Sequence, residues 1–246
     1  MTTSDSPSSL TPDVVAAITG KLDEVADRAR VAAEASGRSG DDVRMLLATK
    51  TQPAEKIRVA LEHGFTLIGE NKVQEITGKA EALADLEPET HLIGPLQKNK
   101  VNHTLRHAHC IQSVDNFPLA EKINNRLDVL DETIDYLIQV NTSREDSKFG
   151  VAPEDAEELI TATRELGRMR LRGLMTVGLP GSSPEEIRPS YSDLRELSEK
   201  LRGAGVMPAE ATELSMGMSN DFELAIGEGA TIVRVGSSIF GARDYT

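Results

Sequence analysis

Short apolar runs alternate with longer amphipathic stretches along most of the chain. Eight runs have the length and aliphatic content of β-strands, at residues 45–50, 66–70, 91–96, 110–114, 134–141, 171–177, 211–215 and 231–235. Apolar residues recur at helical spacing between several of these runs, at residues 55–63, 120–130, 153–166 and 184–201. This order is typical of parallel strands joined by crossover helices in α/β proteins.

The number of strands favours a closed barrel over an open sheet. Eight parallel strands close a (β/α)8 TIM barrel, a fold that takes about 250 residues, and this chain has 246. An open doubly wound sheet would also fit the alternation, but no Gly-rich nucleotide turn follows the first strand. We therefore predict one TIM-barrel domain that spans residues 11–246.

An extra helix precedes the predicted barrel. Thr11 has the residue type of an N-cap, and Pro12 suits the first helical position. Apolar residues then follow at helical spacing, and we expect the helix to end near Gly37. Residues 1–10 are rich in Ser, Thr and Pro, so they are predicted to form a flexible tail.

Composition narrows the classes of function. The formal net charge of −13 argues against binding to a nucleic-acid backbone, which requires clustered Lys and Arg. No apolar run is long enough to span a membrane, and the first residues do not resemble a signal peptide. Cys110 is the single cysteine, and we interpret it as a small buried residue rather than a catalytic thiol. These features predict a cytoplasmic protein.

Lys50 is the first candidate for chemistry. TIM barrels place their active sites at the carboxyl ends of the strands, and Lys50 closes the first predicted strand. Partial desolvation at that place would lower the lysine pKa, which favours Schiff-base chemistry. Most lysines at strand ends simply extend into water, so this interpretation needs support from other residues.

Small residues after the seventh and eighth strands form a candidate phosphate site. Barrels often hold phosphate at these two loops, where backbone N–H groups and hydroxyls donate to it. A helix expected to begin near Asp221 would add its own N–H groups. Tight turns alone would explain either loop, but both together opposite Lys50 favour phosphate binding. The loops read Ser215-Met216-Gly217-Met218-Ser219-Asn220 and Gly236-Ser237-Ser238.

Arg234 lies inside an apolar strand and therefore needs a partner. A structural ion pair is one explanation. The other is that the guanidinium donates to the pyridine nitrogen of pyridoxal 5'-phosphate (PLP). An always-charged donor would keep that nitrogen unprotonated and weaken carbanion stabilisation. Such chemistry suits proton transfer or simple carriage better than decarboxylation or transamination.

Other common chemistries lack their sequence signatures. The chain contains no Walker loop, dinucleotide fingerprint, G-x-S-x-G motif or paired-cysteine zinc site. His103 and His107 share a helical spacing, but no third ligand is spaced to complete a metal site. The loop at residues 178–184 is either a lid over the site or an ordinary surface loop.

Six motifs resemble those of the pyridoxal phosphate homeostasis protein family, the single-domain relatives of the alanine racemase barrel. The resemblance runs from about Arg44 to Tyr245. Thr49 and Lys72 stand where serine and arginine are more usual, which leaves their own contacts open. The motifs are Ala48-Thr49-Lys50-Thr51, Gly69-Glu70-Asn71-Lys72-Val73-Gln74-Glu75, His91-Leu92-Ile93-Gly94-Pro95-Leu96-Gln97-Lys98-Asn99-Lys100, Ser147-Lys148-Phe149-Gly150, Leu214-Ser215-Met216-Gly217-Met218-Ser219 and Val233-Arg234-Val235-Gly236-Ser237-Ser238-Ile239-Phe240-Gly241.

The resemblance implies a type III PLP fold in which Lys50 forms the Schiff base. It also implies that Arg234 lies near the pyridine nitrogen and Asn71 lies beside the cofactor. Ser219, Gly236 and Ser237 are implied at the phosphate. With Met175 and Ser215 added from the sixth and seventh strands, the predicted cofactor-binding residues are Lys50, Asn71, Met175, Ser215, Ser219, Arg234, Gly236 and Ser237.

The family implies a protein that holds and delivers PLP, and so balances pools of PLP and of amino and keto acids. It implies no established turnover, and we assign no catalytic residue and no metal. The expected partners are PLP and the apo forms of PLP-dependent enzymes. We expect a monomer, with a dimer as the alternative.

An amino-acid racemase is the competing hypothesis. Racemisation needs a second acid–base group on the opposite face of the cofactor, and two-domain racemases take a tyrosine from a partner subunit. Tyr136, Tyr191 and Tyr245 are the tyrosines of this chain, and none is clearly predicted to face the barrel mouth. A purely structural or partner-binding barrel without a cofactor is the third hypothesis.

Overall fold

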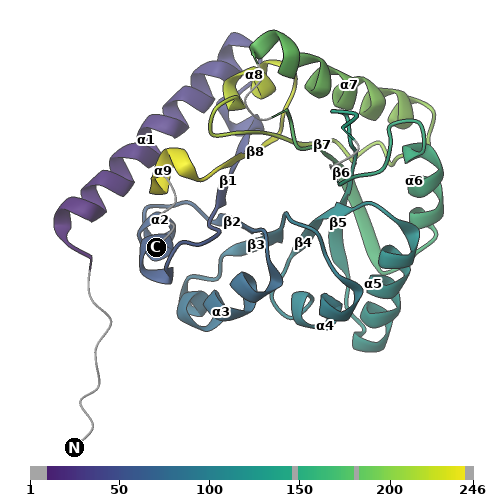
Figure 1. Ribbon diagram of the computed structural model, residues 1–246, viewed down its shortest axis with the longest axis horizontal. Helices are drawn as coiled ribbons and strands as arrows, with labels where there is room; N and C mark the ends of the chain where they lie inside the picture. Colours follow the sequence, from purple (N-terminus) through teal and green to yellow (C-terminus); the bar gives the residue numbers. More distant parts are fainter. Residues whose placement is uncertain (1–9, 146–148, 180–182, 242–246) are drawn as a thin grey trace, which may run out of the picture.

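Eight parallel strands form a closed barrel in the computed structural model, which describes residues 10–145, 149–179 and 183–241 (Figure 1). Each strand pairs with the next along the chain, and the last returns to pair with the first. The predicted TIM barrel is confirmed, and the open doubly wound sheet is wrong. The strands are Arg44–Ala48 (β1), Leu67–Glu70 (β2), Glu89–Leu92 (β3), Cys110–Val114 (β4), Ile134–Gln139 (β5), Met169–Met175 (β6), Glu213–Met218 (β7) and Ile232–Val235 (β8).

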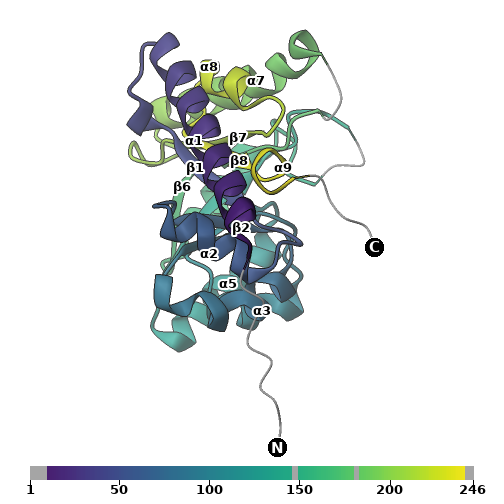
Figure 2. The ribbon, with the colours of Figure 1, turned by 90° about the vertical axis from the view of Figure 1, so that its left-hand side faces the viewer.

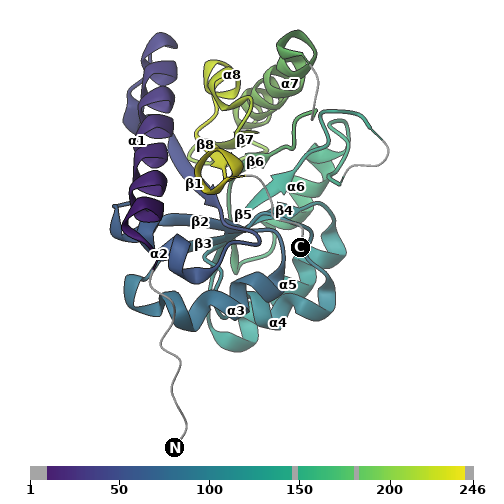
Figure 3. The ribbon, with the colours of Figure 1, turned by 60° about the vertical axis from the view of Figure 1, so that its left-hand side comes forward.

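Helices surround the barrel on its outside (Figure 3). The four helices predicted between strands are present close to their expected bounds. No helix within the described part of the chain is both long enough and apolar enough to cross a bilayer. The α-helices are Pro12–Ala35 (α1), Ala54–Glu62 (α2), Val73–Leu83 (α3), Val101–Thr104 (α4), Phe117–Leu130 (α5), Ala156–Arg164 (α6), Pro184–Gly203 (α7), Phe222–Gly227 (α8) and Ser237–Phe240 (α9), with 3-10 turns at Gly40–Asp42 (η1), Ala84–Leu86 (η2) and Lys98–Lys100 (η3).

Several strands end earlier than the sequence predicts. β1 stops at Ala48, so Lys50 lies in the turn after the strand instead of closing it. β3 stops at Leu92 instead of Leu96, because Gly94 and Pro95 follow and a proline has no N–H for the sheet. Both differences lengthen the loops at the carboxyl end of the barrel, where the predicted site lies.

The predicted N-terminal helix is confirmed as α1, and it completes the outer ring of helices (Figure 2). Thr11 caps it by accepting the N–H of Val14, and Pro12 is its first residue. The helices that follow β7 and β8, α8 and α9, span only six and four residues. α1 packs against α2, α8 and α9, so it covers the side of the barrel that these short helices leave open.

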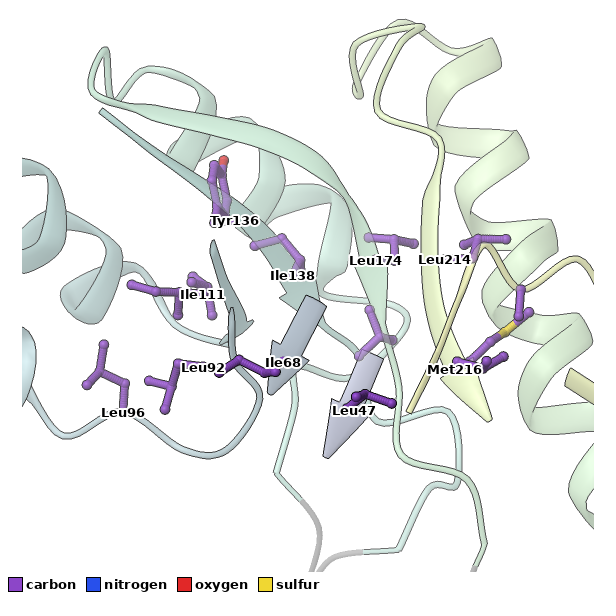
Figure 4. Close-up of a cluster of buried hydrophobic side chains, with 14 of the residues drawn as sticks. Leu47, Ile68, Leu92, Leu96, Ile111, Tyr136, Ile138, Leu174, Leu214 and Met216 are labelled. Atoms are coloured by element: carbon purple, nitrogen blue, oxygen red, sulfur yellow. The ribbon is translucent and has the colours of Figure 1, made fainter. Parts of the chain in front are cut away.

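The main apolar core lies between the strands and the helices (Figure 4). Leu47, Ile111 and Leu174 are fully buried members of this cluster. Because side chains alternate along a strand, their neighbours face the barrel interior. Two small apolar clusters lie there, one formed by Leu46, Leu67 and Ile232 and the other by Cys110, Leu137 and Met175.

Candidate functional site

A cavity of about 670 Å³ lies at the carboxyl ends of the strands. The residues that line it come from the turns after β1, β2, β7 and β8, among other segments. TIM-barrel enzymes place their active sites at this end of the barrel. Six of the eight predicted cofactor-binding residues line the cavity, namely Lys50, Asn71, Ser219, Arg234, Gly236 and Ser237.

Lys50 lies in a turn whose backbone is fixed on both sides. The N–H of the fully buried Thr49 donates to the carbonyl oxygen of Gly69 (3.0 Å), and its hydroxyl donates to Oε1 of Glu70 (2.6 Å). Thr51 has a φ of 64°, in the left-handed region that β-branched residues rarely adopt. Such a conformation persists only where the surroundings impose it. The turn therefore holds position 50 in one place on the cavity wall.

A cluster of charged side chains, Glu70, Glu75 and Lys79, supports this turn. Nζ of Lys79 lies 2.8 Å from Oε1 of Glu70 and 2.6 Å from Oε2 of Glu75, and it donates to the carbonyl oxygen of Thr49 (2.9 Å). Burial raises the pKa of the Glu70 carboxyl, and the hydrogen bond from Lys79 opposes this rise. This cluster was not predicted from the sequence, although Glu75 and Lys79 have the spacing of a helical ion pair.

Replacing Lys79 with methionine is expected to make stability depend more strongly on pH. Without Lys79, burial raises the pKa of Glu70 further, so the protonated carboxyl is favoured in the folded state. A carboxyl whose pKa is raised in the folded state leaves the unfolding free energy at its full value below the ordinary pKa of 4.5. That free energy falls as the pH rises through the raised value. We expect a deficit in unfolding free energy that is small at about pH 4 and reaches about 3 kcal/mol at about pH 8.

Chemical denaturation at a series of pH values measures this deficit. Lys122→Met is the matched control, because Lys122 is exposed on α5, and we expect it to change stability by no more than about 0.5 kcal/mol. A Lys79→Met deficit that stays constant across the pH series would show that Glu70 does not depend on Lys79 for its charge.

Asn71, which lines the cavity after β2, carries a polar atom without a partner. Its Oδ1 is buried and accepts no hydrogen bond among the described residues. Gly94 fixes the backbone here, because a Cβ at that position would lie 2.2 Å from the carbonyl oxygen of Asn71. A buried acceptor without a donor costs free energy, so a bound ligand that donates to it would be stabilised.

The loops after β7 and β8 meet around the hydroxyl of Ser219. Its Oγ accepts the N–H of Gly236 (3.2 Å) and the N–H of Ser238 (3.4 Å). Gly236 cannot carry a side chain without a shift, since a Cβ there would lie 2.6 Å from the carbonyl oxygen of Ala48. Converging backbone donors and hydroxyls of this kind suit an anion. The sequence predicted only a loop here, whereas α9 begins at Ser237.

Arg234 satisfies its guanidinium with uncharged oxygens. Nη1 donates to the carbonyl oxygen and to the hydroxyl of Ser215, both at 2.8 Å, and Nη2 donates to the carbonyl oxygen of Thr176 (2.7 Å). Burial lowers the pKa of Arg234, and the nearby side chains of Tyr191 and Asp221 oppose this effect. Within the described residues these bonds do not support the explanation that Arg234 forms a structural ion pair.

Two predicted residues do not line the cavity. Met175 is fully buried in the barrel interior with Cys110 and Leu137. Ser215 is also fully buried, and it reaches the cavity only through its contact with Arg234. Leu179 and Pro184 line the cavity, but residues 180–182 of the predicted lid lie outside the described residues, so the lid stays a prediction.

Sequence comparison relates this chain to proteins of known name. The family described as "Alanine racemase, N-terminal domain" matches residues 21–244. The "Pyridoxal phosphate homeostasis protein" of Aquifex aeolicus is 43% identical over 92% of this chain and 98% of its own.

Solved structures have the same barrel. An unknown protein from Bifidobacterium adolescentis has a TM-score of 0.88 and 38% identity, over 94% of this chain and 97% of its own. PipY of Synechococcus elongatus with PLP bound has a TM-score of 0.79 and 30% identity, over 91% of this chain and 100% of its own. Alanine racemase of Clostridium difficile shares the fold, with a TM-score of 0.73 and 15% identity over 94% of this chain and 60% of its own. The chain therefore belongs to the pyridoxal phosphate homeostasis protein family.

Proposed function

We propose that this protein binds PLP in the cavity through a Schiff base with Lys50, and that it holds the cofactor for delivery to other proteins. The observation that carries the proposal is the presence of Lys50, Arg234 and the donors around Ser219 on the walls of one cavity. The relative PipY has been solved with PLP bound, which supports the binding of PLP.

The residues of the cavity fit the chemical groups of PLP. Gly236 and Ser238 would donate N–H groups to the phosphate, and the hydroxyls of Ser219 and Ser237 would add to them. Oδ1 of Asn71, which lacks a donor among the described residues, would accept from a ring substituent. When bound, PLP supplies an aldehyde, which condenses with a lysine amine and releases one water, and a ring that withdraws electrons.

Arg234 would limit the reactions that the bound cofactor can support. Its always-charged guanidinium would donate to the pyridine nitrogen and keep that nitrogen unprotonated. A ring in this state is a weak electron sink, so it stabilises a carbanion poorly. The site would therefore hold PLP better than it would use it, which agrees with a role in balancing PLP and amino- and keto-acid pools.

The racemase alternative has weaker support. The hydroxyl of Tyr136 donates to Oγ1 of Thr163 on α6, outside the barrel. Tyr191 is fully buried and is not among the residues that line the cavity. Tyr245 lies outside the described residues. No described tyrosine thus offers the second acid–base group that racemisation needs.

We expect a cytoplasmic monomer whose recipients are the apo forms of PLP-dependent enzymes. Purified protein mixed with PLP is expected to gain a visible absorbance band, and adding such an apo-enzyme is expected to restore that enzyme's activity as the band declines. In deuterated water the loaded protein is expected to show no continued exchange of the α-proton of alanine or serine. Continued exchange would instead favour a racemase, and absence of the band would favour a barrel without cofactor.

A further inference from the structure

A continuous series of hydrogen bonds runs through the barrel interior from its base to Arg234. Nη1 of Arg234 donates to Oγ of Ser215 (2.8 Å), which donates to Oε1 of Gln112 (2.6 Å). Nε2 of Gln112 lies 2.8 Å from Nδ1 of His91, and Nε2 of His91 lies 2.8 Å from Oε1 of Glu89. We refer to Glu89, His91, Gln112 and Ser215 as the interior relay.

One arrangement of hydrogen atoms satisfies every bond of the relay. The hydrogen bond from His91 lowers the pKa of Glu89 to about 2, so this carboxylate only accepts and Nε2 of His91 donates. Burial lowers the pKa of His91, so its ring is neutral and Nδ1 accepts from Gln112. The Gln112 oxygen is then left to accept from Ser215, whose own oxygen accepts from Arg234. In every bond the residue nearer to Arg234 along the series donates and the residue nearer to Glu89 accepts.

Packing alone does not explain these residues. The interiors of TIM barrels are filled mainly by bulky branched side chains. Here His91, Gln112 and Ser215 are at most 2% exposed, and burying such polar groups costs free energy unless each is bonded. Among the described residues, the guanidinium of Arg234 donates only to uncharged oxygens. The series of hydrogen bonds connects it with the carboxylate of Glu89.

We propose that the interior relay positions Arg234: a carboxylate at the base of the barrel orients the guanidinium through three side chains, without a direct ion pair. Arg234 then keeps one orientation while it lines the cavity. The functional consequence rests on the proposed function, because the group that Arg234 meets there is the pyridine nitrogen of PLP. In this account His91, Gln112 and Ser215 are positioning residues that act through Arg234.

Protonation of His91 would break the direction of the relay. A charged ring donates from both nitrogens, so Nδ1 would oppose the donor Nε2 of Gln112 and force that amide to turn over. The charged or titratable groups that face His91 are Glu89 on its own strand, Arg44 on β1 and His109 before β4. Burial is the largest influence and opposes protonation, Glu89 favours it, and Arg44 and His109 oppose it.

Heteronuclear NMR of isotope-labelled protein without cofactor tests the relay directly. We expect His91 to carry its proton on Nε2 and none on Nδ1, from about pH 8 to about pH 6. Its signals are assigned by their loss in His91→Asn. The exposed His103 serves as the control and is expected to exchange between both tautomers. A proton on Nδ1 of His91 would overturn the relay, whatever the protein does with PLP.

A mutant cycle tests the connection to the cofactor. Gln112→Met keeps the length of the side chain but removes the oxygen that accepts from Ser215, so the Ser215 hydroxyl is no longer held in place where it accepts from Arg234. We expect PLP affinity to fall about tenfold, the loss of one hydrogen bond to a charged group. The loss of PLP affinity should be several-fold smaller in a Ser215→Ala background, because residue 112 acts on Arg234 through the Ser215 hydroxyl.

The exposed Gln97→Met is the matched control and should leave PLP affinity unchanged. If Gln112→Met does not fold, Gln112→Glu replaces it with the opposite expectation: its carboxylate still accepts from Ser215, so PLP affinity should be retained, and a loss of affinity would overturn the positioning role. Equal losses of affinity in both backgrounds would overturn the positioning role. A wild-type protein that binds no PLP would instead refute the proposed function and leave the tautomer measurement valid.

Discussion

Lys50→Ala is expected to abolish covalent attachment of PLP and the visible absorbance band that reports it. Lys50 is the only lysine among the described residues that line the cavity. Alanine removes the amine but leaves the backbone donors around Ser219 in place. We therefore expect weak, reversible PLP binding to remain, without the band. Absorbance spectra of PLP-saturated protein before and after dialysis measure both effects.

Lys98→Ala is the matched control for the loss of an amine. Lys98 is exposed in η3 after β3 and does not line the cavity, so this variant should keep the band at full intensity. A Lys50→Ala protein that retains the band after dialysis would show that another amine carries the cofactor, which contradicts the assignment.

Gly173→Ala is expected to destabilise the barrel more than other single-methyl additions. Gly173 lies in β6 opposite Glu213 of β7, at a point where β6 is irregular. A Cβ at this position would lie 1.9 Å from the carbonyl oxygen of Glu213, so the two strands would have to separate. We expect a loss of unfolding free energy of about 3 kcal/mol or more, or no soluble protein at all. Chemical denaturation monitored by circular dichroism measures it.

Gly78→Ala adds the same methyl group where space is open. Gly78 is exposed inside α3, and a Cβ there would meet nothing within 4 Å. Alanine is the better helix former, so we expect a gain of about 1 kcal/mol or less. Equal stability of the two glycine variants would mean that β6 and β7 do not approach each other as closely as described.

The barrel could be predicted from the sequence because its strands leave a strong local signal. Strands of a parallel sheet are buried on both faces, so they appear as apolar runs, as at residues 45–48, which the predicted strand and β1 share. Short elements leave no such signal. α4 and α9 span four residues each, about one helical turn, which is too short for an apolar periodicity to emerge.

Only the parts of the site that lie at strand ends or in family motifs could be predicted from the sequence. Lys50 and Arg234 could be found because each breaks an apolar run at a position with a known geometric meaning. The interior relay could not, because its members are ordinary residues until the barrel closes around them. Gln112 and Ser215 are 103 residues apart in the chain, and no local pattern indicates that their side chains meet.

Reduction of the PLP-loaded protein with borohydride, followed by peptide mass spectrometry, identifies the lysine that holds the cofactor. Borohydride converts a Schiff base into a stable amine, so the modified residue keeps the pyridoxyl group through proteolysis. We expect the peptide containing Lys50 to carry this group and the peptides containing Lys79 and Lys98 to lack it. A pyridoxyl group on another lysine, with Lys50 unmodified, would contradict this expectation.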